Sequence, residues 1–139
     1  MDRLSKERRS WNMGRIRSRD TGPEVAVRSA LHRLGFRFRL HGKSLPGKPD
    51  IVLPKWKHVI LVHGCFWHRH AGCKMAYTPK SRTDFWLEKF RQNVARDEVI
   101  RNELKRLGWS VSTIWECEIE NPQRLAQILD ALAFRIRRT

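Results

Sequence analysis

The segment from residue 63 to residue 73 is the part of this sequence richest in side chains that bind metals or do chemistry. It contains two of the three cysteines, three of the six histidines and two adjacent aromatic residues, Phe66 and Trp67. The third cysteine follows an apolar, strand-like run that ends near Trp115. Structural zinc takes four thiolate and imidazole ligands in a tetrahedron. We therefore predict a structural zinc site with four ligands: Cys65, His70, Cys73 and Cys117.

Two other interpretations of the cysteines are open. They could be three unrelated buried thiols, or a Cys65–Cys73 disulfide with Cys117 left over. The chain opens with polar and charged residues and no apolar leader, which gives no indication of export to an oxidising compartment. An odd number of cysteines also fits a shared metal better than a disulfide framework. We favour the metal and expect a cytoplasmic protein.

The charge of the chain predicts a polyanionic partner. It carries 29 basic and 14 acidic residues among 139, a formal net charge of +15. Nucleic acid is the most common polyanion in a cell, and the six tryptophans are suited to stacking on bases or wedging between them. A solvated basic face without a partner is the simplest alternative. A membrane is disfavoured, because no basic amphipathic helix dominates and no apolar run is long enough to cross a bilayer.

Hydrophobic periodicity divides the chain into a basic arm, residues 1–19, with a short helical piece around residues 11–16, and one domain, residues 20–139. Three helices are expected in the domain: one that begins at residues 20–23 and ends at Gly35, one over residues 83–107, and one capped by residues 121–122. Strands are expected over residues 36–40, 50–53, 58–63 and 109–115. This order predicts a single three-layer α/β domain with a central mixed sheet between helices.

Two acidic residues fall on apolar helix faces. Glu24 precedes Val27 and Leu31 by three and seven residues, so its carboxylate should point toward the core. Asp97 interrupts the apolar stripe of the long helix, where we expect it to pair with a neighbouring arginine. That stripe consists of Phe90, Val94, Ile100, Leu104 and Leu107. Trp109 and Trp115 are expected in the core.

Asp50 is a candidate metal ligand. It directly follows Pro49 at the start of one strand, and the next strand ends at residues 62–63, so an acid and a backbone carbonyl could meet there and chelate Mg²⁺. His68 lies a few residues further on, and histidine titrates near working pH, so it is a candidate base for activating water. The simpler interpretations are a turn-capping aspartate and a histidine that binds zinc or packs. The combination with the charge and the cysteine-rich segment favours a phosphodiester-cleaving site.

These motifs resemble a known family. Pro49–Asp50 before an apolar strand and a second strand is similar to the restriction-endonuclease-like fold, although residues 62–64 replace the usual acid-x-lysine. The very-short-patch repair (Vsr) mismatch endonucleases make this same replacement. The similarity runs in order over residues 10–118, and its core, residues 63–68, is highly specific. The matching segments are Leu45–Asp50, His63–His68, Arg82–Lys89, Asn93–Val94, Gly108–Trp109 and Trp115–Cys117.

The resemblance implies a nick on the 5′ side of the thymine in a T·G mismatch, the product of 5-methylcytosine deamination. It also implies a functional link to a cytosine-5 methyltransferase, contacts with mismatch-repair proteins, and a bacterial, nucleoid-associated monomer. In the catalytic site, Asp50 and the main-chain carbonyl of Val62 would hold Mg²⁺, and His68 would act on the attacking water. Glu24 and His63 would support it through water. The family often has threonine at position 62, and valine should serve equally if only the carbonyl is used.

For recognition, the resemblance implies an aromatic wedge of Phe66, Trp67 and Trp86 beside the mismatch. Met13 would enter from the opposite groove on the basic arm, and Lys89 and Asn93 would contact the mismatched bases. Two other functions fit the residues less completely. A zinc-stabilised DNA-binding module without catalysis leaves Asp50 unused, and a nuclease of the same fold could instead cut undamaged DNA at a recognition sequence.

Overall fold

The computed structural model describes residues 21–138. The basic arm, with its expected helical piece and Met13, lies outside the described residues. Within them, four strands form one sheet in the order β1 (Arg39–Leu40), β2 (Ile51–Leu53), β3 (His58–His63) and β4 (Ser110–Trp115). The first two pairings are antiparallel, and β3 pairs with β4 in parallel. The predicted mixed sheet is confirmed.

Three long helices surround the sheet: α2 (Gly22–Arg33), α4 (Thr83–Arg106) and α6 (Pro122–Arg137). Their starts follow the capping signals of the sequence. The Thr21 hydroxyl accepts a hydrogen bond from the Glu24 N–H at 3.4 Å, and the Asn121 side chain accepts two at the start of α6. Shorter pieces are a 3-10 turn at Pro54–Trp56, α3 (Cys65–His68) and α5 (Glu116–Ile119).

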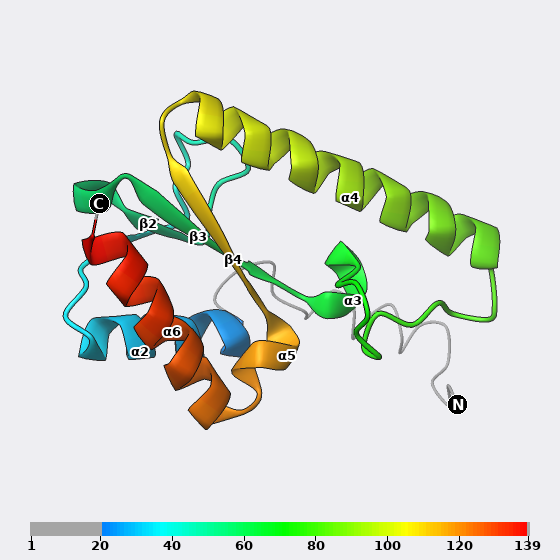
Figure 1. The fold of residues 1–139 in the computed structure, drawn as a ribbon. Helices are drawn as coiled ribbons and strands as arrows, with labels where there is room; N and C mark the ends of the chain where they lie inside the picture. The colour runs from blue at the N-terminus through cyan, green and yellow to red at the C-terminus, as the bar shows by residue number, and fades with distance from the viewer. Residues whose placement is uncertain (1–20, 139) are drawn as a thin grey trace.

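Strand alternation sends side chains into two separate cores, one on each face of the sheet. Ile51, Leu53, Ile60 and Ile114 join the buried faces of α2 and α6 in the larger core. Val52 and Val59, on the opposite face, pack with Leu104 of α4 in the smaller one. The three layers are visible in Figure 1, where α4 lies on one side of the sheet and α2, α5 and α6 lie on the other.

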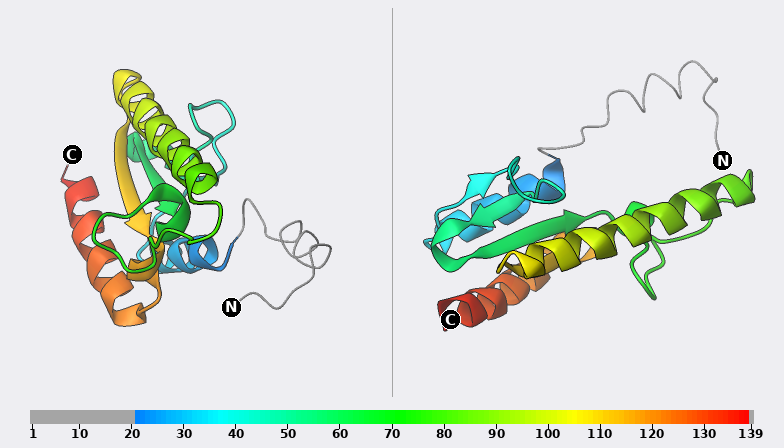
Figure 2. Two further views of the ribbon diagram at one scale, coloured as in Figure 1. Left: turned by 90° about the vertical axis from the view of Figure 1, so that its right-hand side faces the viewer. Right: turned by 90° about the horizontal axis from the view of Figure 1, so that it is seen from above.

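The structure corrects the expected length of the first strand and the expected burial of the apolar stripe of α4. The strand expected over residues 36–40 pairs only at Arg39 and Leu40. Phe36, which was expected on that strand, is instead buried in the larger core. The apolar stripe of α4 is also only partly covered, since Val94 is 45% exposed. The views in Figure 2 show why, because the N-terminal half of α4 extends past the sheet.

Within residues 21–138, no helix is both long and apolar enough to cross a bilayer.

Candidate active site

The four predicted zinc ligands converge on one point. Cys65 begins α3, His70 and Cys73 follow in the next loop, and Cys117 lies in α5 directly after β4. One ligand atom from each lies within 4.8 Å of the others. The His70 Nδ1 atom is 3.7 Å from the Cys65 Sγ and 3.4 Å from the Cys117 Sγ. All three cysteines are free thiols in the structure.

This cluster is chemically suited to a soft divalent cation. Burial raises the pKa of the Cys65 thiol to about 12 and also raises the pKa of Cys117. The Met75 backbone N–H lowers the pKa of Cys73. Two thiols are thus held protonated by burial, and a bound metal would supply the positive charge that their thiolate forms lack. Three thiols and an imidazole are a donor set of structural zinc.

Asp50 is fixed at the junction of two strands. Its Oδ2 atom accepts a hydrogen bond from the backbone N–H of Val62 in β3 at 2.7 Å. Burial raises the Asp50 pKa to about 6, although the Val62 bond partly offsets this shift. The N–H and C=O of one strand residue point to the same side of the strand. The Val62 carbonyl therefore points toward Asp50, which places two hard oxygen donors together.

His68 is paired with Asp97, which corrects the expectation that Asp97 pairs with an arginine. The Asp97 Oδ2 atom lies 2.6 Å from the His68 Nδ1 atom. The correction has a tertiary cause: α4 crosses α3, so the inward face of α4 meets the last residue of α3. The carboxylate accepts the Nδ1 proton, which leaves Nε2 as the basic nitrogen. A histidine held in this tautomer can take a proton from water.

His63 supports the His68 ring. The two imidazoles stack with their centroids 3.9 Å apart and their planes 7° apart. His63 is buried, and burial, with the neighbouring His68, lowers its pKa to about 4. Its Nδ1 atom is buried and makes no hydrogen bond in the described part of the protein. The stack therefore places a neutral imidazole beside the candidate base.

Trp115 joins this pair of histidines to the thiol cluster, which goes beyond its expected role as a core residue. Its ring stacks on His70 at 4.3 Å and meets His63 edge-on at 5.3 Å. It is only partly buried. One ring therefore contacts both the thiol cluster and His63. No feature of the sequence indicated this, because β4 and the loop lie more than forty residues apart.

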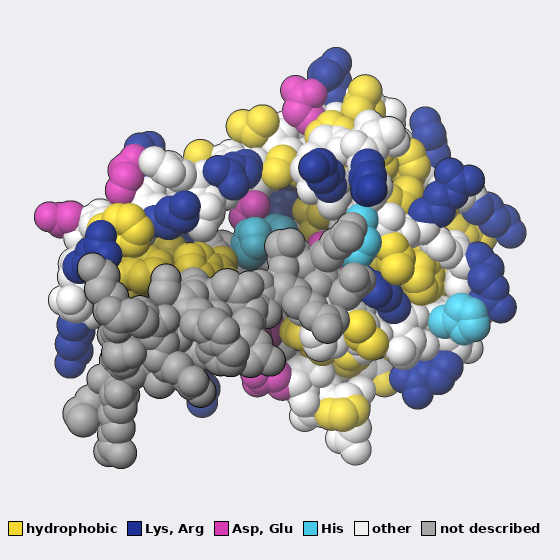
Figure 3. Space-filling view, turned by 180° about the vertical axis from the view of Figure 1, so that it is seen from behind, with side chains coloured by type: hydrophobic (Ala, Val, Ile, Leu, Met, Phe, Trp, Pro, Cys, Tyr) yellow, Lys and Arg dark blue, Asp and Glu magenta, His cyan; other side chains and the backbone are white. Residues whose placement is uncertain are grey.

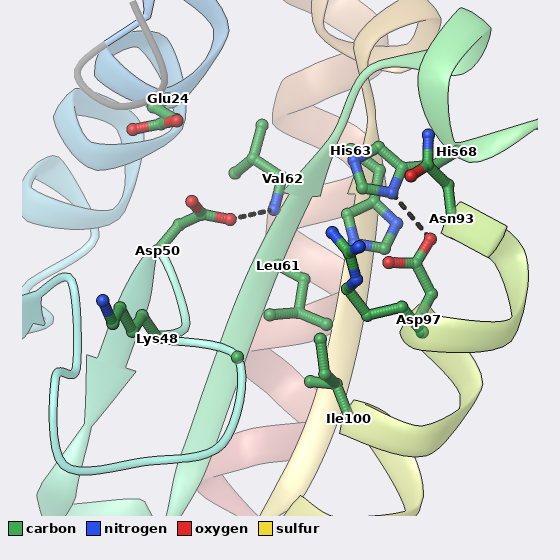
Figure 4. A pocket seen from close by; sticks show the side chains of 12 residues that line it. Glu24, Lys48, Asp50, Leu61, Val62, His63, His68, Asn93, Asp97 and Ile100 are labelled. Atoms are coloured by element: carbon green, nitrogen blue, oxygen red, sulfur yellow. Dashed lines mark hydrogen bonds and ion pairs between the residues drawn. The ribbon is translucent and has the colours of Figure 1, made fainter. Parts of the chain in front are cut away.

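A single pocket of about 250 Å³ brings the candidate catalytic groups together. Figure 4 shows Glu24 and Asp50 on one side of β3 and the His63, His68 and Asp97 group on the other. Glu24 is 4% exposed, so the inward orientation predicted from helix periodicity is confirmed. The wall also includes Lys48 and Arg96, and in Figure 3 histidines lie at a hollow bordered by Lys and Arg side chains.

The candidate aromatic wedge borders the same groove. A second pocket shares Glu24, Val62, His63 and His68 with the first and adds Phe66 and Trp67. Phe66 is the centre of the cluster, with ring centroids 5.1 Å from Trp67 and 5.7 Å from Trp86. Trp67 is 37% exposed. The rings thus pack on one another, and Phe66 and Trp67 still line a pocket with Glu24 and His68.

The two predicted base-reading residues lie on α4 beside this cluster. Lys89 is exposed. The Asn93 side-chain amide donates to the Trp67 carbonyl at 3.2 Å and lines the same pocket as Asp50 and His68. Arg69, which the sequence did not single out, donates to the carbonyls of Phe66, Ala76 and Tyr77 and so closes the loop after α3.

Comparison with known proteins identifies the family. The family model described as DNA mismatch endonuclease Vsr matches residues 1–74. A type II nicking enzyme of Xanthomonas oryzae is 51% identical over 133 residues, which cover 93% of this chain and 97% of that protein. The DNA mismatch endonuclease Vsr of Escherichia coli is 43% identical over 131 residues, 94% of this chain and 82% of that protein.

This chain belongs to the Vsr family. A further relative, a type II nicking enzyme of Neisseria meningitidis, is 44% identical over 136 residues, 98% of this chain and 96% of that protein. The protein is therefore a DNA endonuclease, a hydrolase whose substrate is DNA. The alternative of a DNA-binding module without catalysis is set aside.

The thiol cluster predicts the metal content of the protein. Purified from a reducing cytoplasm and dialysed, the protein should retain a stoichiometric amount of zinc. Cys117→Ser should lower the free energy of unfolding by more than ~3 kcal/mol, the upper end for ordinary substitutions, because a metal ligand is lost. Metal analysis and denaturant unfolding provide the two measurements. Protein without zinc, or with a Cys65–Cys73 disulfide, would contradict the zinc site.

Proposed function

We propose that this Vsr-family protein nicks one DNA strand on the 5′ side of the thymine in T·G mismatches. The observation that carries the proposal is the placement of Asp50 across one pocket from the His68–Asp97 pair. One side of the pocket offers hard oxygen donors and the other offers a base. The names of the relatives, mismatch endonuclease and nicking enzyme, support a reaction that breaks a single strand.

Asp50 and the Val62 carbonyl are the proposed ligands of Mg²⁺, with Glu24 holding a coordinated water. The fit rests on their chemistry, because Mg²⁺ selects oxygen donors and completes its shell with water and phosphate. The partly buried Asp50 carboxylate, whose pKa is raised to about 6, would be stabilised in its charged form by a cation. When bound, Mg²⁺ would neutralise the negative charge that develops at the phosphate.

His68 is the proposed general base. Its Nδ1 proton is held by Asp97, so Nε2 is free to take the proton of the attacking water. The Asp97 carboxylate then stabilises the imidazolium that results, and the stacked His63, whose pKa is lowered to about 4, stays neutral beside it. Lys48 and Arg96 in the pocket wall are placed to attract the phosphate backbone.

Recognition is proposed to depend on opening the duplex beside the mismatch. Phe66, Trp67 and Trp86 insert between base pairs, a deformation that costs a few kcal/mol and is easier at a mismatched step. Lys89 and Asn93 then contact the unstacked bases. We propose that Met13, on the arm of residues 1–19, enters from the opposite groove. The proposed zinc site would hold α3, which carries Phe66 and Trp67 of the wedge.

Several broader features belong to the same proposal. The α/β domain of residues 20–139 is proposed to have the restriction-endonuclease-like fold, with the β2–β3 junction as its catalytic edge. A T·G mismatch arises when 5-methylcytosine deaminates, so we propose a functional link to a cytosine-5 methyltransferase and to mismatch-repair proteins. The working form is proposed to be a monomer at the bacterial nucleoid.

A second candidate function is favoured by one observation. Two of the relatives reported above are named type II nicking enzymes, a name that mentions no mismatch. A nick at an undamaged recognition sequence would use the same catalytic pocket. The two functions differ in whether an intact C·G pair is a substrate.

The central test compares end-labelled duplexes that differ only in T·G versus C·G at one position. With Mg²⁺ present, we expect a nick only in the T·G strand, on the 5′ side of the thymine. Equal nicking of both duplexes at a defined sequence would contradict mismatch specificity and support the second function. A duplex with the mismatch in the opposite orientation serves as a control for strand choice.

Asp97→Asn should slow nicking of the T·G duplex by at least about tenfold, because the amide cannot hold the Nδ1–H tautomer of His68 as the carboxylate does. His68→Ala should be slower still, since a positioned base is worth ~10²–10⁴-fold. Single-turnover rates measure the effect, and DNA affinity should stay unchanged in both variants. Glu98→Gln, which alters the adjacent exposed acid, is the control. A wild-type rate in Asp97→Asn would exclude the positioning role.

The wedge predicts a separate pair of effects. A Trp67→Ala, Trp86→Ala double variant that remains folded should keep its salt-dependent, non-specific affinity for DNA and lose its preference for T·G over C·G. Binding to both duplexes over a range of salt concentrations gives the measurement. If the folded variant keeps its T·G preference, the rings only pack against the loop that carries His70 and Cys73, and the proposed wedge is wrong.

A further inference from the structure

His41 lies directly beside the Asp50 carboxylate, and the backbone register puts it there. The antiparallel pairing of β1 and β2 continues one step beyond the strands, because the His41 N–H donates to the Asp50 carbonyl at 3.1 Å. Residues opposite each other in such a pair place their side chains on the same face, with Cβ atoms about 4.5–5.5 Å apart. His41 is partly buried, with a backbone φ of 51°.

Glu24 completes the group from another element. α2 carries it to the same place, so one ligand atom each of Glu24, His41 and Asp50 lies within 4.8 Å of the others. Two carboxylates and an imidazole gathered this closely favour a cation between them. None of the three comes from the thiol cluster or the His68–Asp97 pair.

The positively charged guanidinium group of Arg28 lies beside two of these three side chains, Glu24 and His41. Its Nη2 atom is 3.2 Å from the Glu24 Oε2 atom and 3.4 Å from the His41 Nε2 atom. The guanidinium can donate only to a neutral imidazole nitrogen, which is also the form that binds a metal. Arg28 therefore occupies the donors that a divalent cation would use, and the two compete.

We propose that His41 joins Asp50 as a direct ligand of the divalent cation, with Glu24 supporting through water, and that this site binds Mn²⁺ in preference to Mg²⁺. The inference rests on the proposed function, because it adds a nitrogen ligand to the metal that we assign to Asp50. Mg²⁺ and Mn²⁺ share a preference for carboxylate oxygen, whereas an imidazole nitrogen suits transition metals and adds little to the binding of Mg²⁺. His41 thus sets the metal preference of this endonuclease.

The test measures Mn²⁺ binding to the zinc-loaded protein without DNA, by the electron paramagnetic resonance signal of free Mn²⁺. Mg²⁺ competition in the same samples gives the affinity ratio. Mn²⁺ competes poorly with zinc for thiolates, so the thiol cluster does not contribute. His41→Asn is the informative variant, because asparagine tolerates a positive φ. His32→Asn, at an exposed histidine in the last turn of α2, is the matched control.

We expect His41→Asn to weaken Mn²⁺ binding by at least about tenfold, the lower end of the effect of losing even an outer-shell partner. Mg²⁺ affinity should stay unchanged, as should both affinities in His32→Asn. Arg28→Met should tighten Mn²⁺ binding, because the competing guanidinium is gone. An unchanged or weaker affinity in Arg28→Met would contradict the competition.

Two outcomes separate this inference from the proposed function. If His41→Asn binds Mn²⁺ like the wild type while Asp50→Asn does not bind it, His41 is no ligand and the inference is wrong, although the metal at Asp50 stands. If Asp50→Asn still nicks the T·G duplex like the wild type, the catalytic metal that we propose at Asp50 fails, whatever His41 does. Thermal unfolding of each variant confirms that a loss of binding is not a loss of fold.

Discussion

The hydrogen bond from the Val62 backbone N–H to the Asp50 carboxylate is the contact on which the rest of the site depends. It joins the residue before β2 to the end of β3 at 2.7 Å, so the carboxylate is positioned by the sheet and not by a mobile loop. The same strand geometry directs the Val62 carbonyl toward that carboxylate. Burial of Asp50 raises its pKa to about 6, so a nearby cation would stabilise its charged form. The metal proposed at Asp50 is therefore positioned by the backbone of the sheet.

The second half of the site is positioned by packing between elements that are distant in sequence. β3 runs on into α3, which carries His68 within 2.6 Å of Asp97 on α4. Trp115, the last residue of β4, contacts both His70 of the thiol cluster and His63 of the candidate site. A metal in the thiol cluster would therefore stabilise the catalytic histidines as well as the loop.

Local sequence signals predicted the elements well and the tertiary pairings poorly. The inward Glu24 and the caps of α2 and α6 depend on neighbours within one or two helical turns, so periodicity was sufficient. The four thiol and imidazole ligands also came together as predicted. The predicted partner of Asp97 was wrong, because the actual partner is determined by where α4 crosses α3. His41 was missed because its position depends on a strand register that composition cannot specify.

The most direct test of the account is whether Asp50→Asn separates cleavage from binding. Asparagine keeps the shape and can still accept the Val62 hydrogen bond, so only the charge is lost. Asp130→Asn, an exposed acid on α6, is the matched control. We predict that Asp50→Asn binds the T·G duplex as tightly as the wild type, because Lys and Arg contacts to phosphate dominate affinity, and that it produces no nick. Wild-type nicking by Asp50→Asn would contradict the account.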